Sequence, residues 1–411
     1  MNILLINHYA GSPRHGMAYR PYYLAREWGR LGHRVRILAA DQSHIRARQP
    51  DLENSARFDE CNDGVDYSWY RTPAYAGNGV GRVRNMAAFV TALYRDARRI
   101  VRDFHPDVVI ASSTYPMDIW PAHRMARLSG ARLLFEVHDL WPLSPMELGG
   151  MSKWHPFIML VQRAEDYAYR HADSVVSMLP KVREYMMSRG LKPEKLHYVP
   201  NGIDPGEWQA GGPGLPDEAA NLLATLRRSG HAIIGYAGTH GVSNALCNIL
   251  DAAALMREEK VAFVLVGSGP AKASLQERAR HARLHKVHFL DPVEKRCIPS
   301  LLECFDVAYI GWHRHPLYRF GIAPNKLMDY MMAARPVLHA VAAGNDPVNE
   351  AGCGMTVEPD DAQAIARGIR ALLTLPDDER HAMGQRGKAF VLAHLTYPVL
   401  GQRFLTACMP R

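Results

Sequence analysis

The sequence predicts an α/β protein built from two doubly wound domains, each with its own parallel sheet. Three observations predict this class. The chain has 411 residues, which exceeds one ordinary core and fits two domains of about 200 residues each. Short β-branched runs alternate with longer helical segments, the pattern of parallel strands joined by right-handed crossovers. This alternation starts again after a loop rich in Gly and Pro, residues 205–216.

The first half opens on a strand at residues 2–7, followed by a Gly-containing loop at 10–16 and a helix at 22–31 that ends at Gly32. Its later strands are expected at 35–39, 108–111, 132–137 and 174–177. A strand at 197–199 is expected to open the second half. The other strands of that half are expected at 232–236, 262–266, 287–289, 307–310, 337–339 and 354–357.

Bulk properties exclude several classes of protein. The content of 47% hydrophobic and 22% charged residues is that of a folded protein. The apolar run at 3–6 is too short for a signal peptide, and no stretch approaches the length of a transmembrane helix. Six cysteines without CxxC or zinc spacing favour a reducing, cytosolic location. The net charge of +8 favours an anionic partner, whether nucleic acid, phosphorylated substrate or acidic lipid, although an arginine-rich surface alone explains it equally well.

The segment GYAGTHG at 235–241 follows a strand and precedes a helical run. Glycines there let backbone N–H groups approach a phosphate, although a tight turn without a ligand has equal weight. The segment VGSGP at 266–270 lacks the third glycine and the following acid of a dinucleotide site, which favours a structural turn over NAD binding. No GxxxxGK[ST] loop is present, so a Walker-type ATPase is excluded.

The richest motif is YRFGIAPNKLMDYM at 318–331, where Pro324 suits the first position of a helix. Asn325 and Lys326 then lie in the first turn, where an ammonium and backbone donors can meet phosphates. A lysine at this end opposes the helix dipole, and an anionic ligand would compensate it. Asp329, one turn later, can accept hydrogen bonds from the two hydroxyls of a ribose. The alternative is an amphipathic helix whose polar face is merely solvated.

His138 and Asp139 follow the apolar strand at 132–137, a position that suits hydrogen bonding or proton transfer at the end of a sheet. A lone histidine is more often structural, so a functional role for His138 depends on its place in the fold. The chain contains no Asp-x-Asp pair, which disfavours a diphosphate held through Mg²⁺ or Mn²⁺. We therefore expect no metal ion and no other cofactor, with positive charge and helix dipoles neutralising the diphosphate instead.

Six motifs together resemble glycosyltransferase family 4, and the resemblance runs almost end to end. They are NHYAGSP at 7–13, FEVHDLWPLSPMELGG at 135–150, VPNGID at 199–204, YAGTHG at 236–241, VLVGSGP at 264–270 and GIAPNKLMDYMMAARPV at 321–337. Within the family the chain is similar to bacterial surface-polysaccharide enzymes of the N-acetyl-fucosamine transferase-like branch. The resemblance implies the GT-B fold, in which two Rossmann-like domains face a central cleft and a C-terminal helix crosses back to the first domain.

This fold implies an acceptor-binding domain at 1–195 together with the C-terminal helix at 389–411, and a nucleotide-sugar-binding domain at 196–388. The resemblance also assigns site residues. The catalytic residues implied are His138, which matches the family's active-site histidine, and Lys326. The donor-binding residues implied are Gly238, Thr239, Gly241, Gly321, Ile322, Ala323, Asn325, Lys326 and Asp329. The acceptor-side residues implied are Gly11, Gly16 and Asp139.

The sequence departs from the family pattern at two places. Of two family glutamates, the second falls on Asp329, whereas the first falls near Gly321, where no carboxylate is present. Backbone at 321–323 is expected to make its contacts. The usual Arg and Lys after Gly241 are not recognisable either, and Lys326 is expected to supply the diphosphate charge.

The function implied is retaining transfer of an N-acetylated hexosamine or deoxyhexosamine from a UDP-sugar to a lipid-linked, polyprenyl diphosphate or saccharide acceptor. The pathways implied are bacterial O-antigen, capsule or exopolysaccharide synthesis. Alternatives are a GDP-sugar donor, a non-catalytic GT-B protein or a UDP-sugar epimerase. A nucleic-acid binder is disfavoured because no reader motif or aromatic-studded basic groove is recognisable.

Two segments favour a peripheral position on the cytoplasmic face of the inner membrane. Residues 82–102 hold six arginines against one acid, Asp96, with interleaved apolar residues, which predicts a basic amphipathic helix. Residues 141–160 hold Trp and Met beside glycines, as a lipid-facing loop would. The alternative for both is an arginine-rich surface and ordinary packing.

Overall fold

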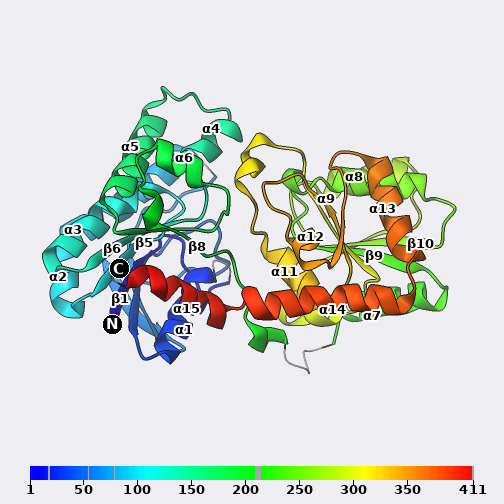
Figure 1. Cartoon of the computed structure of the whole chain (residues 1–411), viewed down its shortest axis with the longest axis horizontal. Helices are drawn as coiled ribbons and strands as arrows, with labels where there is room; N and C mark the ends of the chain where they lie inside the picture. The colour runs from blue at the N-terminus through cyan, green and yellow to red at the C-terminus, as the bar shows by residue number, and fades with distance from the viewer. Residues whose placement is uncertain (17–18, 54, 78, 209–213, 410–411) are drawn as a thin grey trace. The chain divides into compact units, whose positions relative to one another are not determined.

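The computed structural model describes residues 1–16, 19–53, 55–77, 79–208 and 214–409. The chain divides into two compact units, Met1–Asn201 with Tyr397–Arg411 as unit 1 and Gly202–Thr396 as unit 2. Each unit has its own sheet with helices on both faces (Figure 1). The expectation of two doubly wound α/β domains is confirmed.

Unit 1 contains an eight-stranded sheet in the order β3-β4-β2-β1-β5-β6-β7-β8. Its strands are β1 Asn2–Ile6, β2 Arg34–Ala40, β3 Arg57–Asn62, β4 Val65–Tyr70, β5 Val108–Ala111, β6 Arg132–Val137, β7 Ser174–Ser177 and β8 Leu196–Tyr198. Every pair is parallel except β3 with β4, a hairpin that the sequence analysis did not predict. β8 pairs with β7 in this first sheet, which differs from the expectation that residues 197–199 open the second domain.

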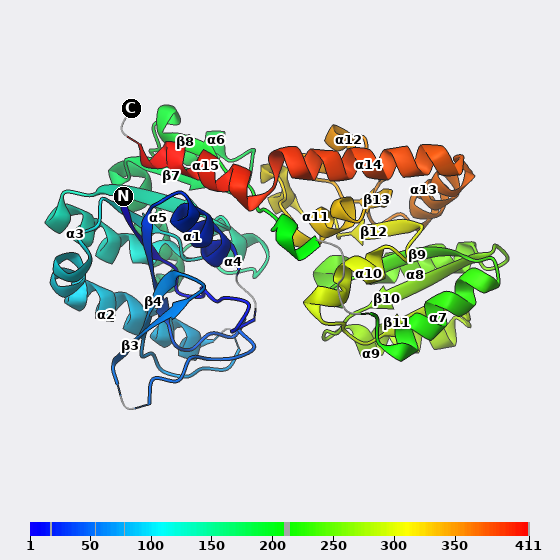
Figure 2. The same ribbon diagram turned by 90° about the horizontal axis from the view of Figure 1, so that it is seen from below.

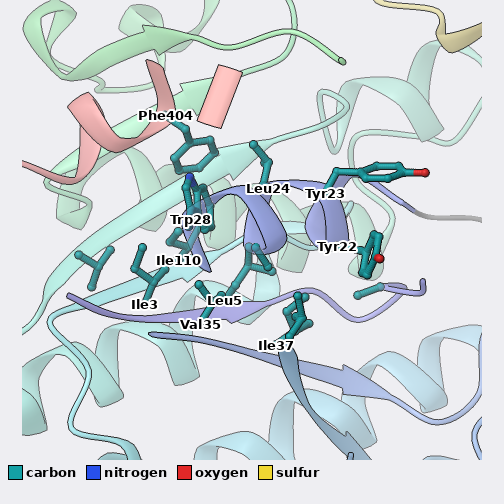
Figure 3. Close-up of a cluster of buried hydrophobic side chains, with 14 of the residues drawn as sticks. Ile3, Leu5, Tyr22, Tyr23, Leu24, Trp28, Val35, Ile37, Ile110 and Phe404 are labelled. Carbon is teal, nitrogen blue, oxygen red and sulfur yellow. The ribbon is translucent and has the colours of Figure 1, made fainter. Parts of the chain in front are cut away.

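The helices of unit 1 cover both faces of this sheet. They are α1 Arg20–Arg30, α2 Val80–Phe104, the 3-10 helix η1 Pro116–Asp118, α3 Ile119–Ser129, α4 Leu143–Glu147, α5 Pro156–His171, α6 Arg183–Ser188, the 3-10 helix η2 Pro193–Lys195 and α15 Tyr397–Cys408. α1 and α15 cover one face, where strand residues such as Ile3 and Ile37 share one apolar core with Trp28 and Phe404 (Figure 3). α2 packs on α3, and α3 contacts β5 and β6.

The C-terminal segment is two helices rather than one. The expected helix at 389–411 is divided between the end of α14, Asp377–His394 in unit 2, and α15 in unit 1. Trp28 Nε1 donates to the carbonyl of Gly401 at 3.1 Å, and the Trp28 and Phe404 rings meet at 5.1 Å. α15 therefore packs on unit 1 beside α1, as the return of the C-terminal helix requires (Figure 2).

Unit 2 contains a six-stranded sheet, parallel throughout, in the order β11-β10-β9-β12-β13-β14. Its strands are β9 Ala232–Ala237, β10 Val261–Val266, β11 Val287–Leu290, β12 Val307–Gly311, β13 Val337–Ala340 and β14 Gly354–Thr356. Its helices are α7 Asp217–Arg228, α8 Leu246–Leu255, α9 Lys272–His281, α10 Ile298–Leu302, α11 Asn325–Met332, α12 Pro347–Ala351, α13 Ala362–Thr374 and α14. The 3-10 helices are η3 Pro205–Trp208, η4 Val242–Asn244, η5 Lys295–Cys297 and η6 Pro316–Phe320. The loop predicted at 205–216 lies partly outside the described residues.

Successive residues of β9 pack into different cores because side chains of a strand alternate between the two faces of the sheet. Ile233 lies in one core with residues of α10, α11 and α14, and Ile234 lies in the other with residues of α8, α9 and α13. Near-continuous apolar strands are what a sheet buried on both faces requires. In the part of the chain that the structure describes, no helix is both long and apolar enough to cross a membrane.

Gly235, in the middle of β9, has a packing role. A Cβ on this residue would lie 2.1 Å from the ring of the fully buried Phe305. The first glycine of the segment GYAGTHG therefore makes room for a core ring, and only the later part of that segment forms the loop after the strand.

We expect Gly235→Ala to destabilise unit 2 by about 2 kcal/mol or more, because an added methyl group forces Phe305 out of its packed position. The measurement is the midpoint of thermal unfolding of the full chain by circular dichroism. Gly214→Ala is the matched control, since a Cβ there meets no atom within 4 Å. Equal midpoints for the two variants would contradict the packing role.

Candidate active site

Two Gly-containing loops of unit 2 are fixed to each other at the carboxyl ends of β9 and β10. Gly238 N donates to Val266 O at 3.0 Å, and His240 N donates to Ser268 O at 2.8 Å. A Cβ on Gly267 would lie 1.9 Å from Gly238 O, so the backbones approach more closely than any side chain at residue 267 allows. The turn at 266–270 thus supports the loop at 238–241.

Lys326 lies in the first turn of α11 and reaches across to the loop after β9. Its ammonium donates to Tyr236 Oη at 2.7 Å and to Asn244 Oδ1 at 2.6 Å. Tyr236 Oη in turn donates to the carbonyl of Thr239 at 2.7 Å. Burial lowers the pKa of Lys326 to about 8, and no ion pair with a carboxylate forms within the described parts of the chain. The ammonium has neutral hydrogen-bond partners, so its charge is uncompensated.

The structure brings the predicted residues Gly238, Thr239 and Gly241 together around this lysine. A Cβ on Gly238 would lie 3.2 Å from Lys326 Nζ, so the glycine keeps the space beside the ammonium open. The amides of Gly238 and His240 already donate within the protein. Within the described chain the amides of Thr239 and Gly241 have no acceptor, which leaves those two for an anion.

Asp329 lies on the same helix but faces other charged groups. Burial raises the pKa of Asp329 to about 7, Lys295 opposes this and the carboxylate of Glu207 adds to it. The side chain is half-buried, and within the described residues no hydrogen bond reaches its carboxylate. Asn325, the first residue of α11, is exposed. Lys326 and Asp329 are thus one helical turn apart, with the ammonium and the carboxylate in separate surroundings.

The predicted backbone contacts at 321–323 are already partly used inside the protein. Gly321 N donates to Tyr318 O at 2.9 Å. Asn345, a residue that the sequence analysis did not identify, accepts from Ile322 N at 2.7 Å and donates to Ile322 O at 3.1 Å. Backbone and side-chain hydrogen bonds therefore fix Gly321 and Ile322, and fewer polar groups of the segment 321–323 remain for a sugar.

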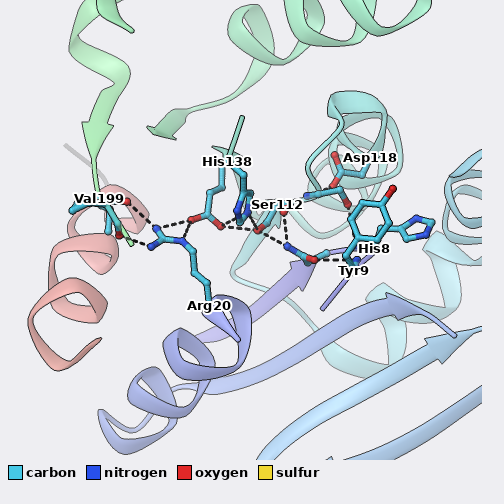
Figure 4. A network of polar contacts seen from close by, with 11 residues as sticks. His8, Tyr9, Arg20, Ser112, Asp118, His138 and Val199 are labelled. Atoms are coloured by element: carbon cyan, nitrogen blue, oxygen red, sulfur yellow. Dashed lines mark hydrogen bonds and ion pairs between the residues drawn. The ribbon is translucent and has the colours of Figure 1, made fainter. Parts of the chain in front are cut away.

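In unit 1, a polar network joins the carboxyl ends of β1, β5 and β6 (Figure 4). Ser112 Oγ donates to Glu136 Oε2 at 2.6 Å and lies 3.1 Å from His138 Nε2. Asn7 Nδ2 donates to the Ser112 carbonyl at 2.6 Å. Parallel strands place these three strand ends at one edge of the sheet, and the network fixes the loops that follow.

The buried ion pair between Arg20 and Glu136 anchors this network. Arg20 Nε and Nη2 donate to Glu136 Oε1 at 2.9 and 2.8 Å, and Nη2 also donates to the carbonyl of Val199 at 2.9 Å. Arg20 Nη1 donates to the carbonyl of Pro200. Burial alone would raise the pKa of Glu136, but Arg20, His138 and Ser112 hold it at about 2. Neither Arg20 nor Glu136 was predicted, although an acid inside the apolar run at 132–137 was a signal that a buried partner exists.

The network also indicates which ring nitrogen of His138 donates a hydrogen bond. Ser112 has a single hydroxyl proton and gives it to Glu136, so its oxygen accepts from His138 Nε2. When an imidazole donates from Nε2 in this way and is neutral, its lone pair is on Nδ1. Within the described residues Nδ1 has no hydrogen-bond partner, so it remains for a substrate hydroxyl.

The acceptor-side residues lie at the same edge of the unit 1 sheet. Asp139 follows His138 directly, is exposed and forms no ion pair with any described residue. The Gly11 carbonyl accepts from Tyr67 Oη at 2.9 Å, and Gly16 turns the loop with φ +69° against Ala47. Both glycines thus have structural contacts in the loop after β1. Across the described chain no three His, Cys, Asp or Glu side chains gather as a metal site.

Comparisons with known proteins agree on one family. Residues 15–202 match the model of the glycosyl transferase 4-like domain, and residues 231–375 match that of glycosyl transferases group 1. The chain is a glycosyltransferase. It belongs to the group 1, or family 4, glycosyltransferases, which depend on nucleotide-sugars.

The glycosyltransferase has relatives along most of its length. WcaI of Escherichia coli K12, a putative colanic acid biosynthesis glycosyl transferase, is 24% identical over 360 residues, 85% of this chain and 87% of WcaI. Sucrose-phosphate synthase from Thermosynechococcus elongatus has a TM-score of 0.72 at 15% identity and covers 98% of this chain and 97% of its own. Anabaena HepE in complex with UDP-glucose has a TM-score of 0.66 at 15% identity, with 98% of each chain covered. These structures confirm the GT-B fold.

We expect Glu136→Gln to destabilise unit 1 by about 3–5 kcal/mol at pH 7, because it leaves a buried guanidinium unpaired. The folded pKa of about 2 lies below the ordinary 4.5, so the carboxylate's contribution is complete above pH 4.5 and is lost as the pH falls towards 2. The variant should lack that part of the acid dependence in urea unfolding from pH 7 to pH 2. Glu194→Gln, at an exposed glutamate of the same unit, is the control. A Glu136→Gln variant as stable and acid-sensitive as the wild type would contradict the ion pair's role.

Proposed function

We propose that this glycosyltransferase moves an N-acetylated hexosamine or deoxyhexosamine from a UDP-sugar to a lipid-linked saccharide in bacterial surface-polysaccharide synthesis. The observation that supports binding of the sugar donor is the ammonium of Lys326 at the start of α11. It is buried, and its partners in the described chain are neutral oxygens, not carboxylates. A buried charge of this kind calls for an anion, and a nucleoside diphosphate supplies it.

The donor would lie along α11. Lys326, with the amides of Thr239 and Gly241, would bind the diphosphate, and Asp329 would accept the ribose hydroxyls one helical turn further on. Asn325 is exposed in the first turn and is available to the phosphates or the sugar. The UDP-glucose complex of HepE, a protein of the same fold, supports UDP as the nucleotide.

Catalysis would depend on electrostatic stabilisation of the leaving group. The β-phosphate gains negative charge as the glycosidic bond breaks, and Lys326 is held in place beforehand by Tyr236 and Asn244. No reorganisation of this donor is needed at that moment. A metal ion is unnecessary in this scheme because the ammonium carries the compensating charge.

The acceptor would bind at the edge of the unit 1 sheet that holds His138 and Asp139. His138 Nδ1 would accept a hydrogen bond from a hydroxyl of the transferred sugar or of the acceptor, and Glu136 and Arg20 act as positioning residues through Ser112. Retention of the anomeric configuration follows from the family. The leaving diphosphate would take the acceptor proton on the same face of the sugar.

A peripheral position on the cytoplasmic face of the inner membrane is the location that fits such an acceptor. The predicted basic segment is the helix α2, with Arg84, Arg95, Arg98, Arg99 and Arg102 exposed. In the segment 141–160, Leu148 and Trp154 are exposed by 57% and 72%. WcaI is described as a colanic acid biosynthesis enzyme, which supports an exopolysaccharide or a related O-antigen pathway.

The nucleotide assignment is tested by thermal shift of the full chain with UDP, GDP, ADP and NAD⁺. We expect UDP to raise the unfolding midpoint, since a ligand at 100 times its Kd adds about 2.7 kcal/mol to the stability of the folded state. Asp329→Ala should abolish the shift, and Glu218→Ala, an exposed acid of the same unit, should retain it. A shift with GDP alone would replace UDP by GDP, and no shift with any nucleotide would remove the donor site from α11.

The role of Lys326 predicts a pH dependence of UDP affinity. With a pKa of about 8, the ammonium is lost between pH 7 and pH 9, so affinity measured by calorimetry should fall about tenfold over that range. Lys326→Arg keeps its charge and should flatten the profile, whereas Lys326→Met should bind weakly at every pH. A steep profile that persists in Lys326→Arg would assign the titration to another group.

A further inference from the structure

Unit 1 carries an apolar groove on the face of the sheet opposite α15. It lies between α2, η1 with α3, and the first turns of α5, and it has a volume of about 460 Å³. Its walls include Val83, Ala87 and Val90 from α2, Trp120 from α3, and Phe157 and Leu160 from α5. Polar side-chain atoms in the lining come from Thr91, Arg95, the hydroxyl of Tyr94 and the indole N–H of Trp120. Leu160 is 42% exposed and Tyr94 43%, so the apolar surface is open to solvent.

One end of the groove is joined to the network around His138 by a chain of ring contacts. Phe157, in the groove wall, meets Trp141 edge to face with ring centres 6.2 Å apart. The guanidinium of Arg82 lies 5.8 Å from the Trp141 ring centre and 5.5 Å from that of Tyr9. Tyr9 N donates to Asn7 Oδ1, and Asn7 belongs to the network of Ser112. Arg82 therefore stands where the groove meets the proposed acceptor site.

The other end of the groove continues into a basic cleft. This second cavity, of about 440 Å³, shares Tyr94 and Trp120 with the groove and adds Arg124 and Arg127. Asp96, the acid of α2 nearest to Tyr94 in sequence, is paired with Arg99 at 2.6 Å. An apolar floor flanked by arginines suits a hydrocarbon chain that carries an anionic group, and it does not suit a neutral sugar.

We propose that this groove holds the hydrocarbon chain of the acceptor lipid next to its phosphate head, with Arg82 at the entrance to bind that head. The inference rests on the proposed lipid-linked acceptor and deepens it, because it assigns the lipid part to a built site in the protein. The phosphate would lie beside Arg82 and Trp141, and the first part of the chain would run between α2 and α5 over Ala87 and Val90. The saccharide would then lie towards His138.

The probe is farnesyl diphosphate, a soluble isoprenoid diphosphate, titrated calorimetrically into the full chain without membranes. We expect saturable binding that inorganic diphosphate does not reproduce. Ala87→Trp should fill the groove and weaken binding at least tenfold, because residue 87 lines it and is exposed. Val80→Trp is the matched control, an exposed apolar residue of the same helix outside the groove, and should bind like the wild type.

Arg82→Gln separates head from chain. It should weaken farnesyl diphosphate binding, whereas its affinity for UDP, like that of Ala87→Trp, should equal that of the wild type. UDP binding is measured in every variant, so a chain that binds UDP but not farnesyl diphosphate overturns the groove and keeps the donor site. A chain that binds farnesyl diphosphate but not UDP supports the groove and overturns the proposed donor.

Vesicles of phosphatidylglycerol distinguish a chain-binding groove from a face that lies on the bilayer. If Ala87→Trp loses farnesyl diphosphate binding but sediments with the vesicles as the wild type does, the groove binds the lipid chain. If the variant loses only vesicle binding, the surface is a membrane-docking face and the proposal is wrong. Equal binding of farnesyl diphosphate by wild type, Ala87→Trp and Val80→Trp would overturn it as well.

Discussion

The positions of the candidate functional residues depend on the common direction of the strands in each sheet. In both sheets every neighbouring pair is parallel except β3 with β4, so the strands of each unit end at one edge. Loops that are far apart in the sequence meet there, as residues 7, 112 and 138 do in unit 1 and residues 238 and 267 in unit 2. Each edge then needs its own side chains or glycines to fix the loops against one another.

The two units surround their buried charged side chains with different kinds of partner. Unit 1 pairs Arg20 with Glu136 and surrounds the pair with Ser112 and backbone carbonyls, so both charges have partners inside the protein. Unit 2 buries the ammonium of Lys326 among neutral oxygens, which lowers its pKa. An internally compensated pair orients neighbours such as His138, whereas an uncompensated charge is suited to binding a ligand of opposite sign. This contrast is the physical basis for assigning positioning to one unit and anion binding to the other.

The helix α2 connects fold, network and surface. Its buried residues include Phe89 and Leu93, and all its arginines except Arg82 are exposed. Between these two faces runs an apolar flank that forms one wall of the groove. Arg82, at the start of the helix, contacts Tyr9 and Trp141 and so lies between that flank and the loop after β1. One helix thereby presents a core face, a charged face and a groove wall.

The sequence alone determined the two-sheet architecture, the positions of most strands and the residues around Lys326, because apolar runs and Gly- or Pro-marked turns are local signals. It did not reveal the hairpin of β3 and β4, in which Glu60 and Asp59 interrupt the apolar pattern, nor the place of β8 in the first sheet. Only the tertiary structure decided that Glu136 pairs with Arg20 and that Asn345 forms hydrogen bonds with the backbone of Ile322. It also decided that the described chain gives Lys326 neutral hydrogen-bond partners and no carboxylate partner. Partners separated by tens to hundreds of residues leave no periodic trace, since their contact is set by how strands and helices pack and not by spacing along the chain.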